Sequence, residues 1–501
     1  MHQKDIKRII RKQLKRNYPN RKQLSKKEKK AIAKAVLEEA VANYEFCQEV
    51  EAPIEELIGI EDQVPTDDIM NLKQMGRFIE DYNNSNIIRF NNYNRSELFI
   101  KDEELKFIDA LIDDRIINNL LWYEGYSPGM RNVFMSNLFR AELLKTIKYP
   151  EISYRKFATR EYLGRDRKEN RVFLGLPLNK GTMIDHTELS KFRSGLSFSQ
   201  IVNVMVYFIY EFNKSGLLGD CVLHGIDSTE LANDCKIPLA SVKVNGTKIR
   251  IYRDLDCDCG KRRNKRDKSE YVIGYRLHTL TAINAQTGHS YPLVSLLSPA
   301  NHHDSNYLLP LVKPGQAIGI EMKLITADEA YHDDNGNFYE ETGVHLTTPP
   351  RRKVSNPENV DSESLEVFLD DMCEMPMSLV GYENNSHEYK CSDDYGECHR
   401  SAICPKFRRI DCDKGNFQRL PKANIPKLKE AHDIRKNIER PFNLLKNQTG
   451  LEEVRVRSQH ALIVRSMFST IGTLLIEMAG KRVKKKNVVK EEQIQLFDIA
   501  A

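Results

Sequence analysis

Four polar residues late in the chain have types and a spacing that could act on a phosphate group. Segment 429–450 reads KEAHDIRKNIERPFNLLKNQTG. If it is helical at about 100° per residue, a stripe of roughly 60° contains His432, Arg435, Glu439 and Lys446. A neighbouring stripe is apolar and could anchor the helix: Ala431, Ile434, Ile438, Phe442 and Leu445. One carboxylate would then lie in a row of potential cations.

A simpler interpretation is a surface ion pair. Arg435 and Glu439 are spaced i, i+4, and such a pair contributes only a few tenths of a kcal/mol to helix stability. Two features argue against it. Pro441 follows Glu439 by two residues and removes a backbone donor, which is unusual for an ordinary solvated helix face. The other feature lies upstream, where two aspartates end strand-like segments.

The two aspartates occupy equivalent places in their segments. Residues 221–226 read as a short apolar strand that ends at Asp227, and residues 322–327 repeat this design before Asp328. Between them, YRLHTLTAINAQTGHSYPLVSLL predicts two strands joined as a hairpin. The order strand, hairpin, helix, strand, helix predicts an α/β fold with a mixed sheet flanked by helices.

These residues resemble the DDE transposases of bacterial insertion sequences. That family has an RNase H-like core, with an acidic triad on two strand ends and a late helix. In one branch the late helix carries Tyr, two residues, Arg, three residues, Glu, six residues and Lys. Arg435, Glu439 and Lys446 match this spacing, whereas His432 stands in place of the Tyr. The resemblance covers about residues 180–479.

The resemblance implies a catalytic triad of Asp227, Asp328 and Glu439. Phosphodiester cleavage can use two divalent cations about 4 Å apart, which activate the attacking oxygen and neutralise the leaving one. Mg²⁺ or Mn²⁺ would suit three carboxylates, with Asp227 between both ions and the other two acids each holding one side. Arg435 and Lys446 would contact DNA phosphates or orient Glu439.

Composition limits the class of protein. The chain has 501 residues, 40% hydrophobic residues, a net charge of +5 and a mean hydropathy of −0.54. No run of about 20 apolar residues and no signal peptide is found, so we expect a cytoplasmic protein without a membrane span, associated with the bacterial nucleoid. Its ten cysteines are then expected as thiols or metal ligands.

Six segments are predicted along the chain. They are a basic arm, helix and acidic linker (1–68), a helical, DNA-binding domain (69–200), the first part of the catalytic core (201–350), a Cys-containing insertion (351–425), the Glu helix with a closing helix (426–480), and a basic, disordered tail (481–501). The helical segments 105–123, 128–148 and 153–163 suit either a DNA-binding module or a packing domain. Trp122 is expected in the core.

Further basic residues are candidates for contact with DNA. HTELSKFR resembles a segment that precedes the catalytic core in the family, which makes Arg193 a candidate, while Thr187 is expected as a helix N-cap and Phe192 as core. Arg455 and Arg457 precede the closing helix. A basic run at 261–268 is expected in a loop, where phosphate contact and simple solvation are equally good explanations.

Four cysteines lie in the predicted insertion: Cys391, Cys398, Cys404 and Cys412. Their spacing lacks the Cys-x-x-Cys pattern of common zinc sites. Relatives of the family can carry a Cys-rich insert at this position. A Zn²⁺ site and four unlinked thiols are therefore equally good interpretations.

The predicted activity is cleavage of double-stranded DNA at transposon ends and strand transfer into target DNA. The resemblance also implies a homodimer that holds two ends together. One alternative is an RNase H-like nuclease without strand transfer, because the same triad serves both reactions. The other is a DNA-binding regulator with an inactive core.

Overall fold

A computed structural model gives the arrangement of the chain. It describes residues 69–84, 96–122, 133–179, 184–218, 223–349, 355–391, 404–417, 434–451 and 458–498, with short gaps inside several of these ranges. Some predicted features lie outside the described residues. They are the arm and linker before residue 69, Cys398, His432, Arg455 and Arg457.

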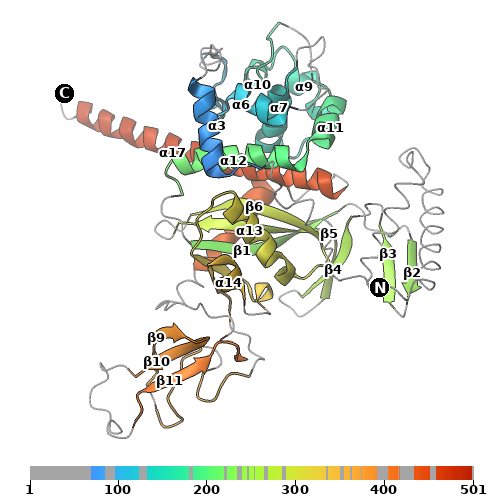
Figure 1. Ribbon diagram of the computed structural model, residues 1–501. Helices are drawn as coiled ribbons and strands as arrows, with labels where there is room; N and C mark the ends of the chain where they lie inside the picture. Colours follow the sequence, from blue (N-terminus) through green and yellow to red (C-terminus); the bar gives the residue numbers. More distant parts are fainter. Residues whose placement is uncertain are drawn as a thin grey trace.

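A mixed sheet forms the centre of the structure (Figure 1). Its strands are β1 (Leu223–Ala232), β4 (Asp258–Arg263), β5 (Ser269–Ile283), β6 (Ser290–Pro299), β7 (Leu324–Ala327) and β8 (His345–Thr347). The order is β6-β5-β1-β7-β8, with β4 paired to the first part of β5. β5 and β6 form the predicted hairpin, and β7 and β8 run parallel to β1. The predicted α/β class with a mixed sheet flanked by helices is confirmed.

The register places both aspartates where two strands part. β1 and β7 are paired in parallel up to Ile226 and Ala327, and β7 ends there. β1 continues to Ala232, paired with β5, so Asp227 lies inside its strand and not at the end that the sequence predicted. Each aspartate nevertheless follows the last residue of the same parallel pairing. The pairing therefore brings the two residues side by side.

Helices cover both sides of the sheet. Helix α13 (Leu308–Ala317) packs on β5 and β6, and the short helix α14 (Phe338–Thr342) packs on β8. The long helix α17 (Gln459–Asp498) crosses β6 and continues against the helical part of the molecule (Figure 1). Because α17 is helical to Asp498, the expectation of a disordered tail from residue 481 was wrong for most of that segment.

Helix α17 contains a segment that is long and apolar enough to cross a membrane. This segment is Gln459–Gly480, with a mean hydropathy of 1.4. However, 78% of it is buried inside the protein, against β6 and the helices around it. Such burial is typical of the core helix of a globular protein.

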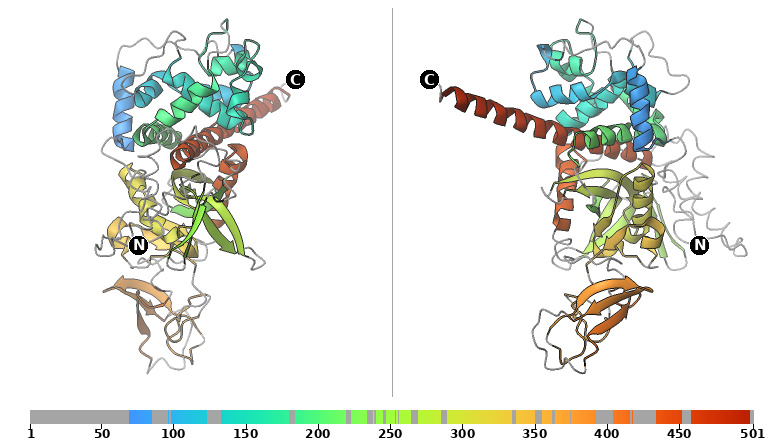
Figure 2. Two further views of the ribbon diagram at one scale, coloured as in Figure 1. Left: turned by 90° about the vertical axis from the view of Figure 1, so that its right-hand side faces the viewer. Right: turned by 60° about the vertical axis from the view of Figure 1, so that its left-hand side comes forward.

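The preceding helical part lies on the far side of α17 from the sheet (Figure 2). It contains α3 (Leu72–Asn84), α5 (Glu103–Leu111), α6 (Asp114–Leu121), α7 (Met135–Lys148), α8 (Tyr154–Phe157), α9 (Arg160–Leu163), α10 (Lys168–Phe173), α11 (His186–Gly195) and α12 (Phe198–Lys214). Its buried side chains and those of the sheet form one continuous hydrophobic core. Among the described residues, these two parts therefore behave as one packed body.

Several local expectations in this part need correction. The single helix expected at 105–123 is two helices, because Asp113 caps a new helix with its side chain. The N-cap expected at Thr187 is Asp185, which accepts from the backbone N–H groups of Thr187 and Glu188. Trp122 is 61% exposed and follows the end of α6, so it is not a core residue. Phe192 is buried as expected.

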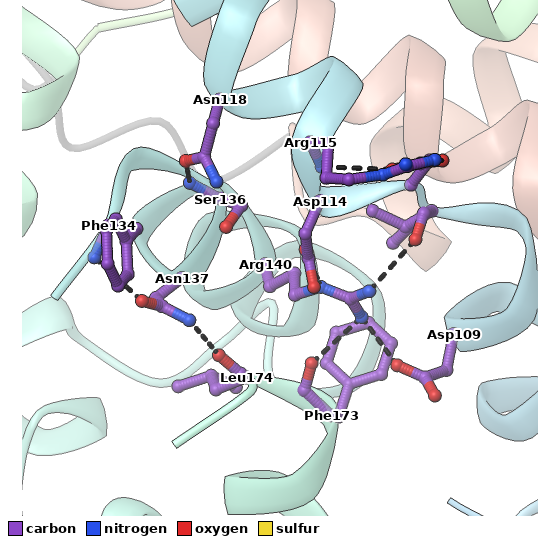
Figure 3. Close-up of polar contacts among 12 residues, drawn as sticks. Asp109, Asp114, Arg115, Asn118, Phe134, Ser136, Asn137, Arg140, Phe173 and Leu174 are labelled. Atoms are coloured by element: carbon purple, nitrogen blue, oxygen red, sulfur yellow. Dashed lines mark hydrogen bonds and ion pairs between the residues drawn. The ribbon is translucent and has the colours of Figure 1, made fainter. Parts of the chain in front are cut away.

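One buried arginine ties the helical part together (Figure 3). Arg140 on α7 donates to Asp109 on α5 at 2.5 Å and to Asp114 on α6 at 2.6 Å. It also donates to the carbonyl oxygens of Ile112 and Phe173, so its guanidinium is satisfied by four partners. Charged groups are tolerated in a core only when they are paired in this way.

A second cluster of buried charges joins α7 to α17. Lys145 donates to the carbonyl oxygen of Pro150 at 2.9 Å and lies near Arg465 and Arg193. Burial, and then the charge of Arg465, lower the pKa of Lys145 to about 7, although Glu142 opposes this shift. Arg465 donates to Thr146 on α7 and to the backbone after the Glu helix.

The insertion after β8 has a small core of its own. Strands β9 (Ser378–Glu383), β10 (Ser386–Lys390) and β11 (Phe407–Asp411) form an antiparallel sheet in the order β11-β10-β9. Side chains of this sheet and of the segment before it form a separate hydrophobic cluster: Val367, Met377, Tyr389, Ile410 and Phe417.

A further hairpin, β2 (Ala240–Val244) and β3 (Thr247–Ile251), precedes β4.

Arg140→Leu is expected to lower the free energy of unfolding by about 3–5 kcal/mol, because it leaves two carboxylates without their buried partner. Chemical denaturation measures this. Arg115→Leu is the matched control, since the Arg115–Asp113 pair is more exposed and its loss should cost less than about 1 kcal/mol. Equal losses in the two variants would contradict the structural role assigned to Arg140.

The pH dependence of stability should reveal Lys145. Below pH 7 its amine is charged in both folded and unfolded chains, so folding carries the cost of burying the charge. Above pH 7 the folded protein releases the proton while the unfolded chain keeps it, so stability rises. Lys145→Met should remove a rise on the order of 2 kcal/mol between pH 7 and 9. Parallel pH profiles of unfolding for the two proteins would show that this burial is unimportant.

Candidate active site

Asp227 and Asp328 face the same guanidinium group. The Arg435 Nη1 atom lies 4.0 Å from Asp227 Oδ2 and 3.8 Å from Asp328 Oδ1. The Asp227 side chain is 23% exposed and the Asp328 side chain is 49% exposed, so the group is accessible to solvent where β1 and β7 part. The structure therefore brings together three of the residues that the sequence selected.

The environment of Asp227 disfavours its ionised form. Burial raises the pKa of Asp227 to about 6, and the charges of Asp328 and Asp304 add to this effect. The backbone N–H of Ser228 and the charge of Arg435 act in the opposite direction. Asp227 is thus a carboxylate with two acidic neighbours, which is an environment that a cation would stabilise.

The segment that carries Glu439 consists of three consecutive short helices of different types. Residues Lys436–Ile438 form a 3-10 turn, α16 covers Glu439–Asn443, and a π-helical turn covers Leu444–Gln448. Pro441, in the middle, has no N–H to donate, and irregular turns around it are a common response. A 3-10 turn advances by about 120° per residue, so three such residues rotate the chain about 60° further than an α-helix would.

Arg435 and Glu439, four residues apart, have different surroundings. Arg435 points to the two aspartates, whereas Glu439 is exposed one turn later. Among the described residues, no group of three or more His, Cys, Asp or Glu side chains is close enough to hold a metal ion. His432 lies outside the described residues, so the polar stripe stays a prediction, whereas its apolar neighbours Ile438, Phe442 and Leu445 are buried as predicted.

Four contacts fix the Glu439 segment on the sheet and on α17. Ile438 lies directly over Gly225 of β1, where a Cβ atom would collide with the isoleucine side chain. Ser290 donates to the carbonyl oxygen of Asn437 at 2.5 Å. Arg440 donates to His289 at 2.6 Å and to Glu477 of α17 at 2.7 Å. The position of Glu439 along the sheet is thus set by its immediate neighbours in sequence.

In this conformation a divalent cation would be held by the two aspartates without Glu439. Asp227 and Asp328 present hard oxygen ligands to the same positive charge, which in this structure is the Arg435 guanidinium. Glu439 would have to approach them to complete the triad. The donor set therefore fits Mg²⁺ or Mn²⁺ at the aspartate pair.

The remaining predicted residues lie apart from this group. Arg193 is paired with the buried Glu142, and its guanidinium stacks on Tyr154 at 3.8 Å, which is a packing role between α7, α8 and α11. Lys446 lies in the π-helical turn. The first residues of the predicted basic loop, Lys261–Arg263, belong to strand β4, and the rest of that run is outside the described residues.

The insertion does not bring its cysteines together as one set. The backbone N–H of Cys391 donates to Lys406 before β11, whereas Cys412 follows β11 and bonds Asn385 at the other end of β10. Six residues of extended chain between Lys406 and Cys412 span about 20 Å. Zinc ligands bind at about 2.3 Å, so Cys391 and Cys412 cannot share one ion here. Cys398 lies outside the described residues.

A group of polar residues behind the aspartates was not predicted from the sequence. Arg276 on β5 donates to Asp304 at 2.7 Å, and Ser228 donates to the same carboxylate at 3.3 Å. His278, on the same face of β5, is fully buried. One signal was present: in YRLHTLT, charged or titratable residues alternate with apolar ones in a strand that is buried on both faces.

Comparison with known proteins identifies the region around this site. Residues 241–475 match the family model described as the transposase DDE domain. This region is a transposase DDE domain. The match starts in β2 and ends in α17, so it includes Asp328 and Glu439, whereas Asp227 lies just before it. The prediction of a DDE-type transposase is confirmed by this match.

Other comparisons add less. No curated protein matches the chain. A cryo-EM structure of the piggyBac transposase synaptic complex with hairpin DNA is similar over 79% of this chain and 76% of that one, at 12% identity. Its TM-score is 0.30, so the assignment of the DDE domain depends on the family match.

A bulkier residue at position 225 should displace the Glu439 segment. Gly225→Ala is expected to reduce DNA cleavage about tenfold or more, because Ile438 has to move. The double variant Gly225→Ala, Ile438→Val should recover part of this loss, since it returns space at the contact. Rates of cleavage are the measurement. A loss in Gly225→Ala that the second substitution does not reduce would show that this contact does not position the helix.

Proposed function

We propose that this protein is a DNA transposase that cleaves DNA at the ends of its own element and joins the freed 3′ hydroxyl to target DNA. The observation that carries this proposal is the pair Asp227 and Asp328 facing one cation beside the segment with Glu439. The DDE domain match supplies the class of reaction.

The proposed roles follow from these positions. Asp227 and Asp328 would hold a divalent metal ion, Mg²⁺ or Mn²⁺, with Glu439 as the third carboxylate. Bound metal would activate the attacking oxygen and stabilise the leaving oxygen of the phosphodiester. Arg435 neutralises the aspartate pair in its present position, and a guanidinium is also suited to bidentate contact with a DNA phosphate. Burial around Asp227 reduces competition from water.

The proposed partner is double-stranded DNA, both as transposon end and as target. An element has two ends, so its excision needs two active sites, and a homodimer would provide them. We place the protein in the cytoplasm of its host, where DNA is directly accessible. The burial of α17 inside the body agrees with a protein that does not enter a membrane.

One observation favours a second candidate function. Glu439 is exposed and does not join the aspartate pair in this conformation. A DNA-binding regulator with an inactive core would need no closed triad. Cleavage by the purified protein separates the two candidates, and a strand-transfer assay separates a transposase from a nuclease that only cuts.

Asp227→Asn, Asp328→Asn and Glu439→Gln should each reduce cleavage of end-containing DNA by about a thousandfold, which corresponds to about 4 kcal/mol. Each change removes a charge and keeps the shape of the side chain, so DNA binding in a gel-shift assay should be retained. Glu321→Gln is the control, because this exposed carboxylate lies before β7, at the opposite end from Asp328.

Cleavage at the unmodified rate in all three variants would exclude the carboxylates from the chemistry. Loss in the two aspartate variants alone would restrict the site to that pair. DNA binding without any cleavage by the unmodified protein, in both Mg²⁺ and Mn²⁺, would favour the regulator. Cleavage without joined products would favour the nuclease.

A further inference from the structure

Asp227 and Asp328 are connected behind the surface by a buried chain of polar contacts. We propose that Tyr331 and His278 are positioning residues that set the separation of the two aspartates and thereby tune the affinity of the site for a divalent cation. This inference rests on the proposed function. It concerns residues that do not themselves contact the cation.

The Asp328 side of this chain is a short turn. Asp328 begins the 3-10 turn Glu329–Tyr331, and its carboxylate accepts from the backbone N–H of Glu329 at 2.8 Å. The N–H of Tyr331 donates to the carbonyl oxygen of Asp328 at 2.9 Å. The Tyr331 side chain is fully buried, and its hydroxyl lies 2.6 Å from His278 Nδ1. The turn that presents Asp328 is therefore fastened to strand β5.

His278 is held on its other sides as well. Its Nε2 lies 2.9 Å from Ser298 on β6, and its ring stacks on Tyr307 with the centroids 4.1 Å apart. The Ser298 hydroxyl donates to Pro299, so it accepts from His278 Nε2–H, which leaves Nδ1 to accept the proton of Tyr331. Burial lowers the pKa of His278, so this imidazole adds no charge beside the aspartates.

The Asp227 side begins at the residue directly opposite His278. Ser228 is the cross-strand neighbour of His278 in the β1–β5 pairing. Its backbone N–H donates to Asp227 Oδ1 at 2.7 Å, and its hydroxyl donates to Asp304, which Arg276 holds at 2.7 Å. Burial, and then the charges of Asp304 and Asp227, raise the pKa of the Tyr331 hydroxyl, so this hydroxyl lies near the Asp227 side as well.

This arrangement fixes two like charges that would otherwise move apart. Each carboxylate is oriented by a backbone N–H, and each of those backbones is tied to His278, one through Tyr331 and one through strand pairing. Groups that orient metal ligands typically change metal affinity about 10–100-fold when they are removed. The Tyr331 hydroxyl is the single contact whose loss should loosen Asp328 without removing a ligand.

Binding of Mn²⁺ to the full-length protein without DNA tests this role. Tyr331→Phe should weaken binding about tenfold, measured by isothermal titration calorimetry. Tyr307→Phe is the matched control. Tyr307 is also buried and its ring stacks on His278, but its hydroxyl bonds His302 and not His278. Its loss should change Mn²⁺ affinity by less than about twofold, while thermal unfolding shifts equally in the two variants.

Equal effects of Tyr331→Phe and Tyr307→Phe on Mn²⁺ affinity would overturn the inference. If Tyr331→Phe does not fold, Ser298→Ala serves instead, since it removes the hydroxyl that accepts from His278 Nε2–H; unchanged Mn²⁺ affinity in that variant would also overturn it. Asp227→Asn separates the two proposals. Unchanged Mn²⁺ binding in Asp227→Asn would overturn the proposed metal site itself. Loss in Asp227→Asn with no loss in Tyr331→Phe would overturn only the positioning role.

Discussion

The arrangement of the site depends on holding the carboxylates of Asp227 and Asp328 side by side in a partly buried position. Asp227 and Asp328 repel each other, and burial makes the ionised form of Asp227 less favourable. Without metal, the only opposing charge that the described residues show at both carboxylates is Arg435. The parallel pairing of β1 with β7 and the contacts of Ser228 and Tyr331 hold the pair in spite of this repulsion.

The segment around Glu439 is held beside this pair by its neighbours in the sequence. Ile438 packs on Gly225, and Arg440 lies between His289 and Glu477. Glu439 itself is exposed, and among the described residues it forms no metal-binding group of three with the aspartates. In this structure the Arg435 guanidinium lies where a metal ion would face the two aspartates.

Sequence patterns predicted the parts of the fold that depend on periodicity. The hairpin of β5 and β6, the strands before the two aspartates and the apolar seam of the Glu helix were all visible as alternation or spacing. Patterns could not show that Ile438 packs on Gly225, because this contact joins residues far apart in the sequence. The polar residues behind Asp227 were missed for a similar reason: Asp304 meets Ser228, and Tyr331 meets His278, through contacts between residues far apart in the sequence. Cys391 and Cys412 of the predicted zinc site lie apart, because strand register, and not spacing in the sequence, decides which side chains are close together.

Helix α17 determines which shortened forms of this protein can exist. Its first half covers β6 on one side and α5, α7 and α12 on the other, with Leu462, Phe468 and Leu475 buried. Asp254 and Asp256, far upstream, accept from the N–H groups of Ser458 and Gln459 at its start. A copy of the gene interrupted before codon 459 would encode a chain with an uncovered sheet and an open helical layer. Such a product would aggregate or be degraded, so truncated copies of this kind would not accumulate as soluble competitors of the intact protein.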